Sequence, residues 1–546
     1  MTFRLKKAAL ALTVPAVLLA SCVKVNTELG KDLLDKSLLY DTYTVEFPLT
    51  DVQMRHADKL SGYSDTRITI GAIRDEVFGL TTRESAFTLI PDRDTIYLGE
   101  NPEPVKFDIH FAADTISTAM DGQEHILQNI YVYELLDTLG RTNTSTTRDI
   151  PHSDKRITRG IPVYNGSDSL SFEFSTEFAR KYIDAIVSLG GSDHIIPSYK
   201  DYVCALPGIF IQTDVPEGIG GRINMFDFSC LSVSNDRYVR NGNVALLTIR
   251  STYDGVRKDT TFMFVPGEPD FYNEVALLKD NQYFYQYAFN HTTHQTSEMP
   301  AKDVLYVEGG GGLKPVISAR EIQQKTVEAI RARGGDPAKA VIGKATIVLP
   351  LAPMDAEFKD LAFYPSVLSP TVCMEFDGGN VQFAGLSDAS ASNENQGDLD
   401  RSNLAYTPDI TYHLQEILRE EVDETHDIWL LTVHTEVIET ASGSSADDEY
   451  YRQMMYAMYY NNLYGGGYGG YGGYGGYGGY GGYNSYGYSN YYNYWMLAQM
   501  MANSNQTTVS TTQALDKDRY YRAVLNGPEA GNNVPLFRVT FSVPKE

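Results

Sequence analysis

Short runs of β-branched and aromatic residues, separated by polar turns, recur along most of this 546-residue chain. Such residues favour the pleated surface of a strand. The strands predicted in this way are residues 43–47, 105–111, 130–135, 170–174, 209–213, 222–228, 245–252, 304–307, 345–351, 371–376, 428–438, 520–525 and 536–543. Strands that alternate with turns in this way predict a mainly β protein with two antiparallel β-sandwich-like domains, rather than parallel βαβ units.

Turns and a few helices complete this prediction. Asn165-Gly166-Ser167-Asp168 is a turn sequence, and Asp377-Gly378-Gly379-Asn380 predicts a hairpin. Residues 175–188, 319–332 and 408–420 carry apolar side chains at helical spacing. We expect these three amphipathic helices to cap the edges or ends of the sheets.

The predicted domains are residues 41–295 and 303–546, with the boundary near residues 291–303. Residues 445–510 interrupt the second domain with a Tyr-, Met- and Gly-rich low-complexity stretch. We expect this insertion to lie in a loop between strands 428–438 and 520–525, which look like a pair. Because long loops are tolerated at little energetic cost, the insertion need not disturb the domain around it.

The insertion contains a Gly-Gly-Tyr array in which Tyr recurs at every third position from Tyr468 to Tyr483. Gly-rich chains behave as flexible coils, whereas Tyr side chains are flat amphipathic groups that stack on sugars or on other aromatic rings. One interpretation is a flexible contact tether that self-associates or touches an envelope polymer. The other is an expanded loop that the domain merely tolerates.

The first residues of the chain predict its cellular localisation. Residues 1–21 comprise a basic start with Arg4, Lys6 and Lys7, followed by an apolar run over residues 8–20, which is typical of a secretion signal. The run is too short to span a bilayer. It ends in Leu-Ala-Ser before Cys22, which resembles a bacterial lipobox, so we expect the signal to be removed and Cys22 to be lipidated with diacylglycerol and palmitate-type chains. Residues 22–40 would then form an N-terminal tether.

The charge of the chain is strongly acidic, with 45 Lys plus Arg against 70 Asp plus Glu and a net charge of −25. Removing residues 1–21 takes away three basic residues and no acidic ones, which leaves 42 against 70 and a charge of −28. This balance argues against nucleic acid as a partner. Val23 follows Cys22, which favours the outer membrane, and the absence of an acidic cluster there favours its periplasmic side over the cell surface.

Three cysteines remain besides Cys22, namely Cys204, Cys230 and Cys373, and none has the spacing of a zinc site. In an oxidising compartment, Cys204 and Cys230 form the plausible disulfide, because they flank neighbouring predicted strands. Three buried free thiols are the alternative. We predict no metal and no cofactor.

Several short segments follow one another along the chain in a recognisable order: residues 71–81 (Gly-Ala-Ile-Arg-Asp-Glu-Val-Phe-Gly-Leu-Thr), 207–211, 221–223, 309–313 with 316–317, 412–418 and 522–527. In this order they resemble a family of Bacteroidetes lipoproteins known as DUF4270, a domain of unknown function. The resemblance covers residues 33–543 apart from the insertion. It implies an envelope lipoprotein and assigns no activity.

Motifs with catalytic chemistry are sparse in this sequence. The chain contains neither a G-x-S-x-G nor an H-E-x-x-H motif. His291 and His294 could hold a metal at i, i+3 spacing, but we expect a solvated loop there. Residues 393–400 are rich in oxygen ligands without matching an EF-hand, so we expect a polar surface loop. Asp75 and Glu76 are the acids we name for a glycosidase pair, although Asp75 in a Gly-rich turn fits a bond to its own backbone better.

Five Asp-Ser/Thr sequences resemble the O-glycosylation motif of Bacteroidetes periplasmic proteins. The acceptors would be Thr95, Thr115, Thr138, Ser169 and Thr260. A glycan at these positions would be a solubilising surface group.

These features favour a lipid-anchored outer-membrane protein that is not an enzyme and has a structural or binding role, with an envelope protein or a glycan as ligand. The alternative is an enzyme that acts on envelope glycans through a carboxylate pair. Two carboxyls facing each other in an aromatic cleft would favour the enzyme.

Overall fold

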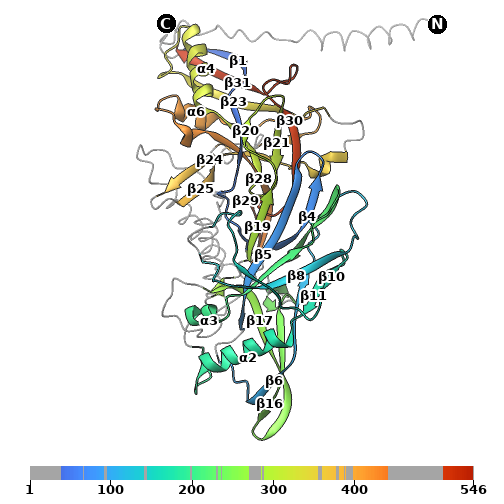
Figure 1. Cartoon of the computed structure of the whole chain (residues 1–546). Coiled ribbons are helices and arrows are strands. Elements are labelled where there is room, and N and C mark those ends of the chain that lie inside the picture. The colour runs from blue at the N-terminus through green and yellow to red at the C-terminus, as the bar shows by residue number, and fades with distance from the viewer. Residues whose placement is uncertain are drawn as a thin grey trace, which may run out of the picture.

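The computed structural model describes residues 39–64, 67–91, 95–140, 144–196, 199–228, 231–234, 237–240, 242–269, 284–285, 288–353, 359–376, 380–386, 388, 397–440 and 508–544. The chain is mainly β and its strands pair antiparallel, which confirms the predicted fold class. Figure 1 shows an elongated molecule with two bodies, one at each end.

The first body is built on one 15-stranded sheet. Its strands are β3 (Tyr63–Ser64), β4 (Arg67–Asp75), β5 (Gly79–Pro91), β6 (Glu100–Ala112), β7 (Thr118–Ala119), β8 (Gln128–Leu135), β9 (His152–Arg156), β10 (Val163–Tyr164), β11 (Ser169–Glu173), β12 (Ile209–Thr213), β13 (Gly220–Asp227), β16 (Ala245–Tyr253), β17 (Val256–Pro269), β18 (Phe284–Tyr285) and β19 (Ala288–His294). A separate hairpin consists of β14 (Leu231–Ser234) and β15 (Arg237–Arg240).

Two helices cover the core of this body, α2 (Thr176–Gly190) and α3 (Tyr199–Ala205). The N-cap of α2 is Ser175, whose hydroxyl accepts a bond from the Phe178 N–H at 3.2 Å. Its apolar face then buries Phe178 and Tyr182 against Phe107 of β6. The predicted helix over residues 175–188 is therefore confirmed.

The second body contains two larger sheets and a short strand pair. The five-stranded sheet runs β1 (Tyr40–Pro48), β31 (Leu536–Pro544), β23 (Val341–Pro350), β27 (Ala405–Tyr406), β26 (Leu399–Asp400). The seven-stranded sheet comprises β20 (Met299–Pro300), β2 (Val52–His56), β22 (Leu313–Ile317), β28 (Ile428–Thr440), β24 (Leu368–Phe376), β25 (Asn380–Gly385) and β29 (Thr508–Leu515). The short pair is β21 (Val304–Glu308) with β30 (Arg522–Asn526).

Both larger sheets contribute to one apolar core, in which Phe537 and Ile347 from one sheet lie with Leu313 and Leu430 from the other. Helices α4 (Ala319–Ala332) and α6 (Thr411–Ile417) add Ile322, Ile330 and Leu414 to this core. Two short 3₁₀ turns, Lys359–Phe363 and Glu424–His426, complete the body. The arrangement is a sandwich.

Helix α4 has the predicted bounds, because its signals are local. The Ser318 hydroxyl accepts from the Glu321 N–H at 3.3 Å. Glu321 then accepts from the Thr50 and Asp51 N–H groups at 3.0 and 2.9 Å and so holds the chain between β1 and β2. Helix α6 is shorter than the predicted 408–420, because Asp409 accepts from the Thr411 N–H at 2.9 Å and sets its start.

Strand pairing corrects two expectations. Residues 40–56, placed in the first predicted domain (41–295), pair with the second body, since β1 pairs with β31 over nine residues and β2 pairs with β22. The boundary near 291–303 does fall between β19, which pairs with β5, and β20, which pairs with β2.

The second correction concerns the insertion. Strand β28 pairs with β29, not with residues 520–525, which pair with β21 as β30. The ladder between β28 and β29 extends to the pair Thr440 and Thr508. The Gly-Gly-Tyr array lies outside the described residues, between these two paired positions. Residues 377–379 of the predicted hairpin turn lie outside the described residues; the strands on either side, β24 and β25, pair antiparallel as far as Phe376 and Asn380.

Candidate functional site

Charged and polar side chains gather where the two bodies meet, and we call this group the interbody polar cluster. It comprises Ser64, Arg67, Asp75, Arg83, Asp114, Asn290, Thr292 and His294 from the first body, and Glu308, Lys314, Asp516, Asp518, Arg519 and Arg522 from the second. A buried charge is costly unless it is paired and hydrogen-bonded, so the contacts of each group indicate its role.

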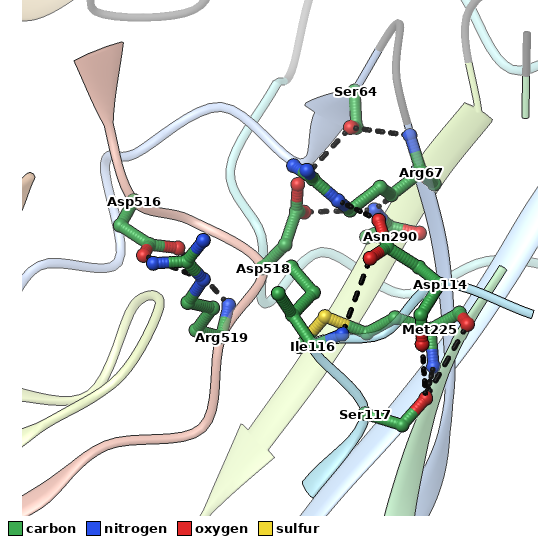
Figure 2. A network of polar contacts seen from close by, with 10 residues as sticks. All are labelled: Ser64, Arg67, Asp114, Ile116, Ser117, Met225, Asn290, Asp516, Asp518 and Arg519. Atoms are coloured by element: carbon green, nitrogen blue, oxygen red, sulfur yellow. Dashed lines mark hydrogen bonds and ion pairs between the residues drawn. The ribbon is translucent and has the colours of Figure 1, made fainter. Parts of the chain in front are cut away.

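Asp518 reaches from the segment between β29 and β30 into the first body, as Figure 2 shows. Its carboxylate accepts from Asn290 Nδ2 at 3.0 Å and from the Ser64 hydroxyl at 3.2 Å. Nearby, Arg67 Nε pairs with Asp114 Oδ2 at 2.5 Å. Asp518 thus joins strands β3 and β19 to the C-terminal part of the chain.

Asp516 fixes the local shape of the same segment. Its carboxylate accepts from the Arg519 N–H at 3.1 Å and from the Tyr521 hydroxyl at 2.7 Å. Arg519 Nε lies 3.6 Å from the same carboxylate. The next residue, Lys517, donates through Nζ to the Tyr63 carbonyl at 2.6 Å, again across the two bodies.

Glu308 is the buried acid at the end of β21, with 2% of its surface exposed. Its carboxylate accepts from the Thr296 hydroxyl at 2.5 Å and from the Leu313 N–H at 2.9 Å, and His294 Nδ1 lies 3.3 Å away. Burial alone would raise the pKa of Glu308, but the hydrogen bonds from His294, Thr296 and the Leu313 N–H outweigh it and lower the pKa to about 2. The carboxylate is therefore ionised at neutral pH.

The glycine loop between β21 and β22 closes around Lys314. Lys314 Nζ donates to the carbonyls of Gly310 at 2.9 Å, Gly312 at 3.2 Å and Glu308. Burial lowers the pKa of Lys314 to about 7. Gly310 has φ of +54°, and a Cβ there would lie 2.6 Å from Arg83 Nη1, so glycine is required at this position.

Arg83 is the largest fully buried side chain of the described residues. Its Nη1 donates to the Thr292 hydroxyl and to the Lys517 carbonyl, the latter at 3.3 Å. Burial lowers its pKa, while Asp518, Asp516, Glu84 and Glu308 oppose that shift. Its position ties strand β5 to the segment that carries Asp516 and Asp518.

Asp75 behaves as the turn residue that the sequence favoured. Its Oδ1 accepts from the Val77 and Phe78 N–H groups at 2.8 and 2.9 Å. Its Oδ2 pairs with Arg522 of the second body. Glu76 is exposed. The two acids named for a glycosidase pair therefore differ in environment, and Asp75 belongs to the interbody polar cluster.

A second acidic pair lies at the start of α6. Asp388 accepts from the Tyr412 and His413 N–H groups at 2.5 and 3.0 Å, so it caps the helix beside Asp409. Burial, together with the charge of Asp409, raises the pKa of Asp388 to about 6. Asp388 and Asp409 are 2% and 9% exposed, so both carboxyls lie within the body.

The expectation of a solvated loop at His291 and His294 is wrong, because both belong to strand β19. His291 Nδ1 lies 2.6 Å from Glu84 Oε2, and His294 is buried beside Glu308. Burial lowers the pKa of His294. The prediction failed because these residues pair as β19 with β5, a strand that is remote in sequence.

Other predicted positions are scattered over the molecule. Cys204, in α3, is exposed, which contradicts the alternative of three buried thiols. Cys230 lies outside the described residues, so its disulfide with Cys204 stays a prediction. Cys22 and residues 393–396 also lie outside the described residues. Of the loop predicted over residues 393–400, Leu399 and Asp400 form β26 instead. Of the predicted glycosylation positions, Thr95 and Thr115 are exposed, and Thr138, Ser169 and Thr260 are half-buried.

Sequence reasoning missed the members of the cluster that matter most. Arg83, Glu308, Lys314, Asp516 and Asp518 stand in no recognisable motif. Arg83 and Asp518 bond to residues hundreds of positions away, whereas Glu308 and Lys314 bond to residues close to them in sequence. The glycine run 309–312 was a usable signal, since such a run indicates close approach of another group. Chemically, the cluster holds fixed charges away from solvent and connects the two bodies.

No family model, curated protein or solved structure matches this chain. Among the described residues, no helix is both long and apolar enough to cross a membrane. The same part of the chain contains no group of three or more His, Cys, Asp or Glu side chains that could hold a metal ion.

Proposed function

We propose that this chain is a lipid-anchored envelope protein of the outer membrane, attached through Cys22, with a structural or binding role rather than a catalytic one. The proposal retains the resemblance to DUF4270 lipoproteins and their absence of an assigned activity. It places the protein on the periplasmic side of the membrane, with an envelope protein or a glycan as ligand.

The proposal of a non-catalytic role rests on the burial and the hydrogen bonds of the carboxylates in the interbody polar cluster. Asp75, Glu308, Asp516 and Asp518 are at most 6% exposed, and each accepts bonds from groups of the same chain. A general acid or nucleophile must reach its substrate. These carboxylates instead connect the two β-rich bodies of an elongated molecule, which suits a protein that spans a distance or presents a surface.

The alternative, an enzyme that acts on envelope glycans, has one observation in its favour. Asp388 and Asp409 form a pair in which one carboxyl has a raised pKa, as a glycosidase acid requires. Their low exposure and their bonds to the start of α6 support the capping role instead.

Cys22→Ala tests the anchor. Cells labelled with palmitate should incorporate it into the wild-type protein and not into the variant, and the variant should leave the outer-membrane fraction. As a matched control, Cys373→Ala should change neither result. Palmitate labelling of the Cys22→Ala protein, or its retention in outer membranes, would contradict the proposal.

A further inference from the structure

Two histidine side chains meet where the chain crosses between the two bodies. His56 is the last residue of β2 in the second body, and His294 is the last residue of β19 in the first. Their ring centroids are 6.2 Å apart, and the ring planes are inclined at 39°. The chain enters the first body through residues 57–62 and leaves it through residues 295–298. We call the two rings the crossing histidines.

The hydrogen bonds of the two rings determine which nitrogen of each ring carries a proton. His56 Nε2 lies 3.0 Å from the Thr296 carbonyl oxygen, which can only accept, so the proton is on Nε2. His294 Nδ1 lies 3.3 Å from the ionised Glu308 carboxylate, which likewise only accepts. Burial lowers the pKa of His294, which favours the neutral ring. In the neutral form, each ring keeps one lone pair, on Nδ1 of His56 and on Nε2 of His294.

Neither lone pair has a partner among the described residues. The His294 side chain is 3% exposed, and its Nε2 is buried without a hydrogen bond. The ring of His56 is hydrogen-bonded through Nε2, and within the same part of the chain its Nδ1 has no bond. A buried polar atom without a partner is costly. The two lone pairs therefore indicate a bound group that the chain itself does not supply.

The hydrogen bonds on the other nitrogens are those that proteins give to metal-binding histidines. Such an imidazole donates its second N–H to a carboxylate or a backbone carbonyl, which fixes the tautomer and the orientation of the ring. Glu308 has this role for His294, and the Thr296 carbonyl has it for His56. Two rings bound to one ion through Zn–N bonds of about 2.0–2.1 Å have centroids roughly 5–6.5 Å apart. The observed 6.2 Å falls within this range.

Residues 295–298 hold both rings in place. The Thr296 carbonyl accepts from His56 Nε2, and the Thr296 hydroxyl donates to Glu308 at 2.5 Å. Glu298 accepts from the His56 N–H at 2.8 Å. Glu298 is exposed and His56 is half-buried, so an ion can reach the rings from this side.

The ligand atoms select the class of metal. Neutral imidazole suits Zn²⁺, Cu²⁺ and Ni²⁺, whereas Ca²⁺ and Mg²⁺ take oxygen ligands. The charges around His294 are mixed, because Arg83 and Lys314 oppose a cation and Glu308 favours it. Imidazole binds through its lone pair and needs no negative charge, as three-histidine zinc sites show. The described residues contain no group of three or more metal-binding side chains, so water would complete the coordination.

We propose that the crossing histidines bind one late first-row divalent metal ion, of the Zn²⁺ type, through His56 Nδ1 and His294 Nε2. Since each body supplies one ligand, the ion would clamp the junction between the bodies. The sequence predicts no metal, because His56 and His294 are remote from each other along the chain. The nearer histidine, His291, lies beside Glu84 instead, with Nδ1 2.6 Å from its Oε2. The proposal is independent of the lipid anchor and of any envelope ligand.

The test uses the whole chain from residue 22 with Cys22→Ala, which also removes a thiol that could bind metal. The protein is freed of metal and titrated with zinc sulfate in competition with a chromophoric chelator. One equivalent of Zn²⁺ should bind at micromolar concentration. Electron paramagnetic resonance of the same protein with one equivalent of Cu²⁺ should show splitting from two imidazole nitrogens. This spectrum needs no variant.

His56→Gln should lower the zinc affinity about 100-fold or more, since loss of even a supporting group costs about 10–100-fold. The matched control is His125→Gln, which removes an exposed histidine of the first body and should leave the affinity within about twofold. Melting temperatures in chelator show that each variant folds. Excess zinc should raise the melting temperature of the wild type and the control by about 3 °C or more, and leave that of His56→Gln unchanged.

Unchanged zinc affinity in His56→Gln, or an equal loss in His125→Gln, would overturn the proposal, because other side chains would then hold the metal. Absence of a zinc equivalent at micromolar concentration would also overturn it. A Cu²⁺ spectrum with a single imidazole nitrogen would do the same. In either of these last two cases, a water molecule that donates to the two lone pairs would explain the unpartnered nitrogens.

Discussion

Replacing Glu308 by glutamine is the sharpest test of the interbody polar cluster. Glutamine keeps the shape of the side chain and removes its charge. The ordinary pKa of a Glu carboxyl, 4.5, falls to about 2 in the fold. A depressed carboxyl pKa means that the folded state favours the ionised form, so its contribution to stability is present above pH 4.5 and is lost as pH falls towards 2.

The magnitude follows from that difference. A shift of about 2.5 pKa units corresponds to roughly 3 kcal/mol at 25 °C. Glu308→Gln should therefore lower the free energy of unfolding by about 3 kcal/mol at pH 7. At pH 3 the same substitution should cost less than half of this, about 1.4 kcal/mol, because the wild-type carboxyl is then almost fully protonated in the unfolded state and still largely ionised in the folded state.

Urea unfolding followed by circular dichroism at pH 7 and pH 3 measures both values. Glu46→Gln is the control, since Glu46 and Arg538 form a pair 2.5 Å apart whose side chains are about half exposed. Exposed pairs contribute about 0–1 kcal/mol. An effect of Glu308→Gln below about 1 kcal/mol at pH 7 would refute the reasoning, as would an equal effect at both pH values, which would indicate lost packing rather than lost charge.

Two further predictions concern α6 and the insertion. The pKa of Asp388 is raised to about 6, so its contribution to stability is greatest below about pH 4 and declines as pH rises through 6. The wild type should therefore lose about 2–3 kcal/mol relative to Asp388→Asn between pH 4 and pH 7 in urea titrations; parallel curves would show that Asp388 does not titrate in the fold. Deleting residues 465–489 should shift the melting temperature by no more than about 2 °C, because length in a loop costs little. Unfolding of the second body in calorimetry would show that the array is structural, whereas loss of envelope partners in a pull-down at unchanged stability would favour the contact tether over the tolerated loop.

Local physics explains what the sequence determined by itself. Strand alternation and turn chemistry depend on neighbouring residues, so residues 209–213 coincide with β12, and 536–543 with most of β31. The bounds of α4 follow from Ser318 and Glu321, three positions apart, and from apolar residues at helical spacing. The turn role of Asp75 likewise needs only Val77 and Phe78. The mainly β class is the sum of such local preferences.

Only the tertiary structure decided which distant strands meet and which charges are buried. Strand β1 pairs with β31, about 500 residues away, and β28 pairs with β29 and not with β30. Neither pairing can be predicted from the residues next to these strands in the sequence. His291 and His294 look like loop residues until β5 pairs with β19. In the sequence, nothing distinguishes Glu308 and Asp518 from the other acidic residues among the 70 Asp and Glu of the chain. The lowered pKa of Glu308 and the bonds of both acids arise because the two bodies exclude water from between them, and exclusion of water is a property of the assembled fold.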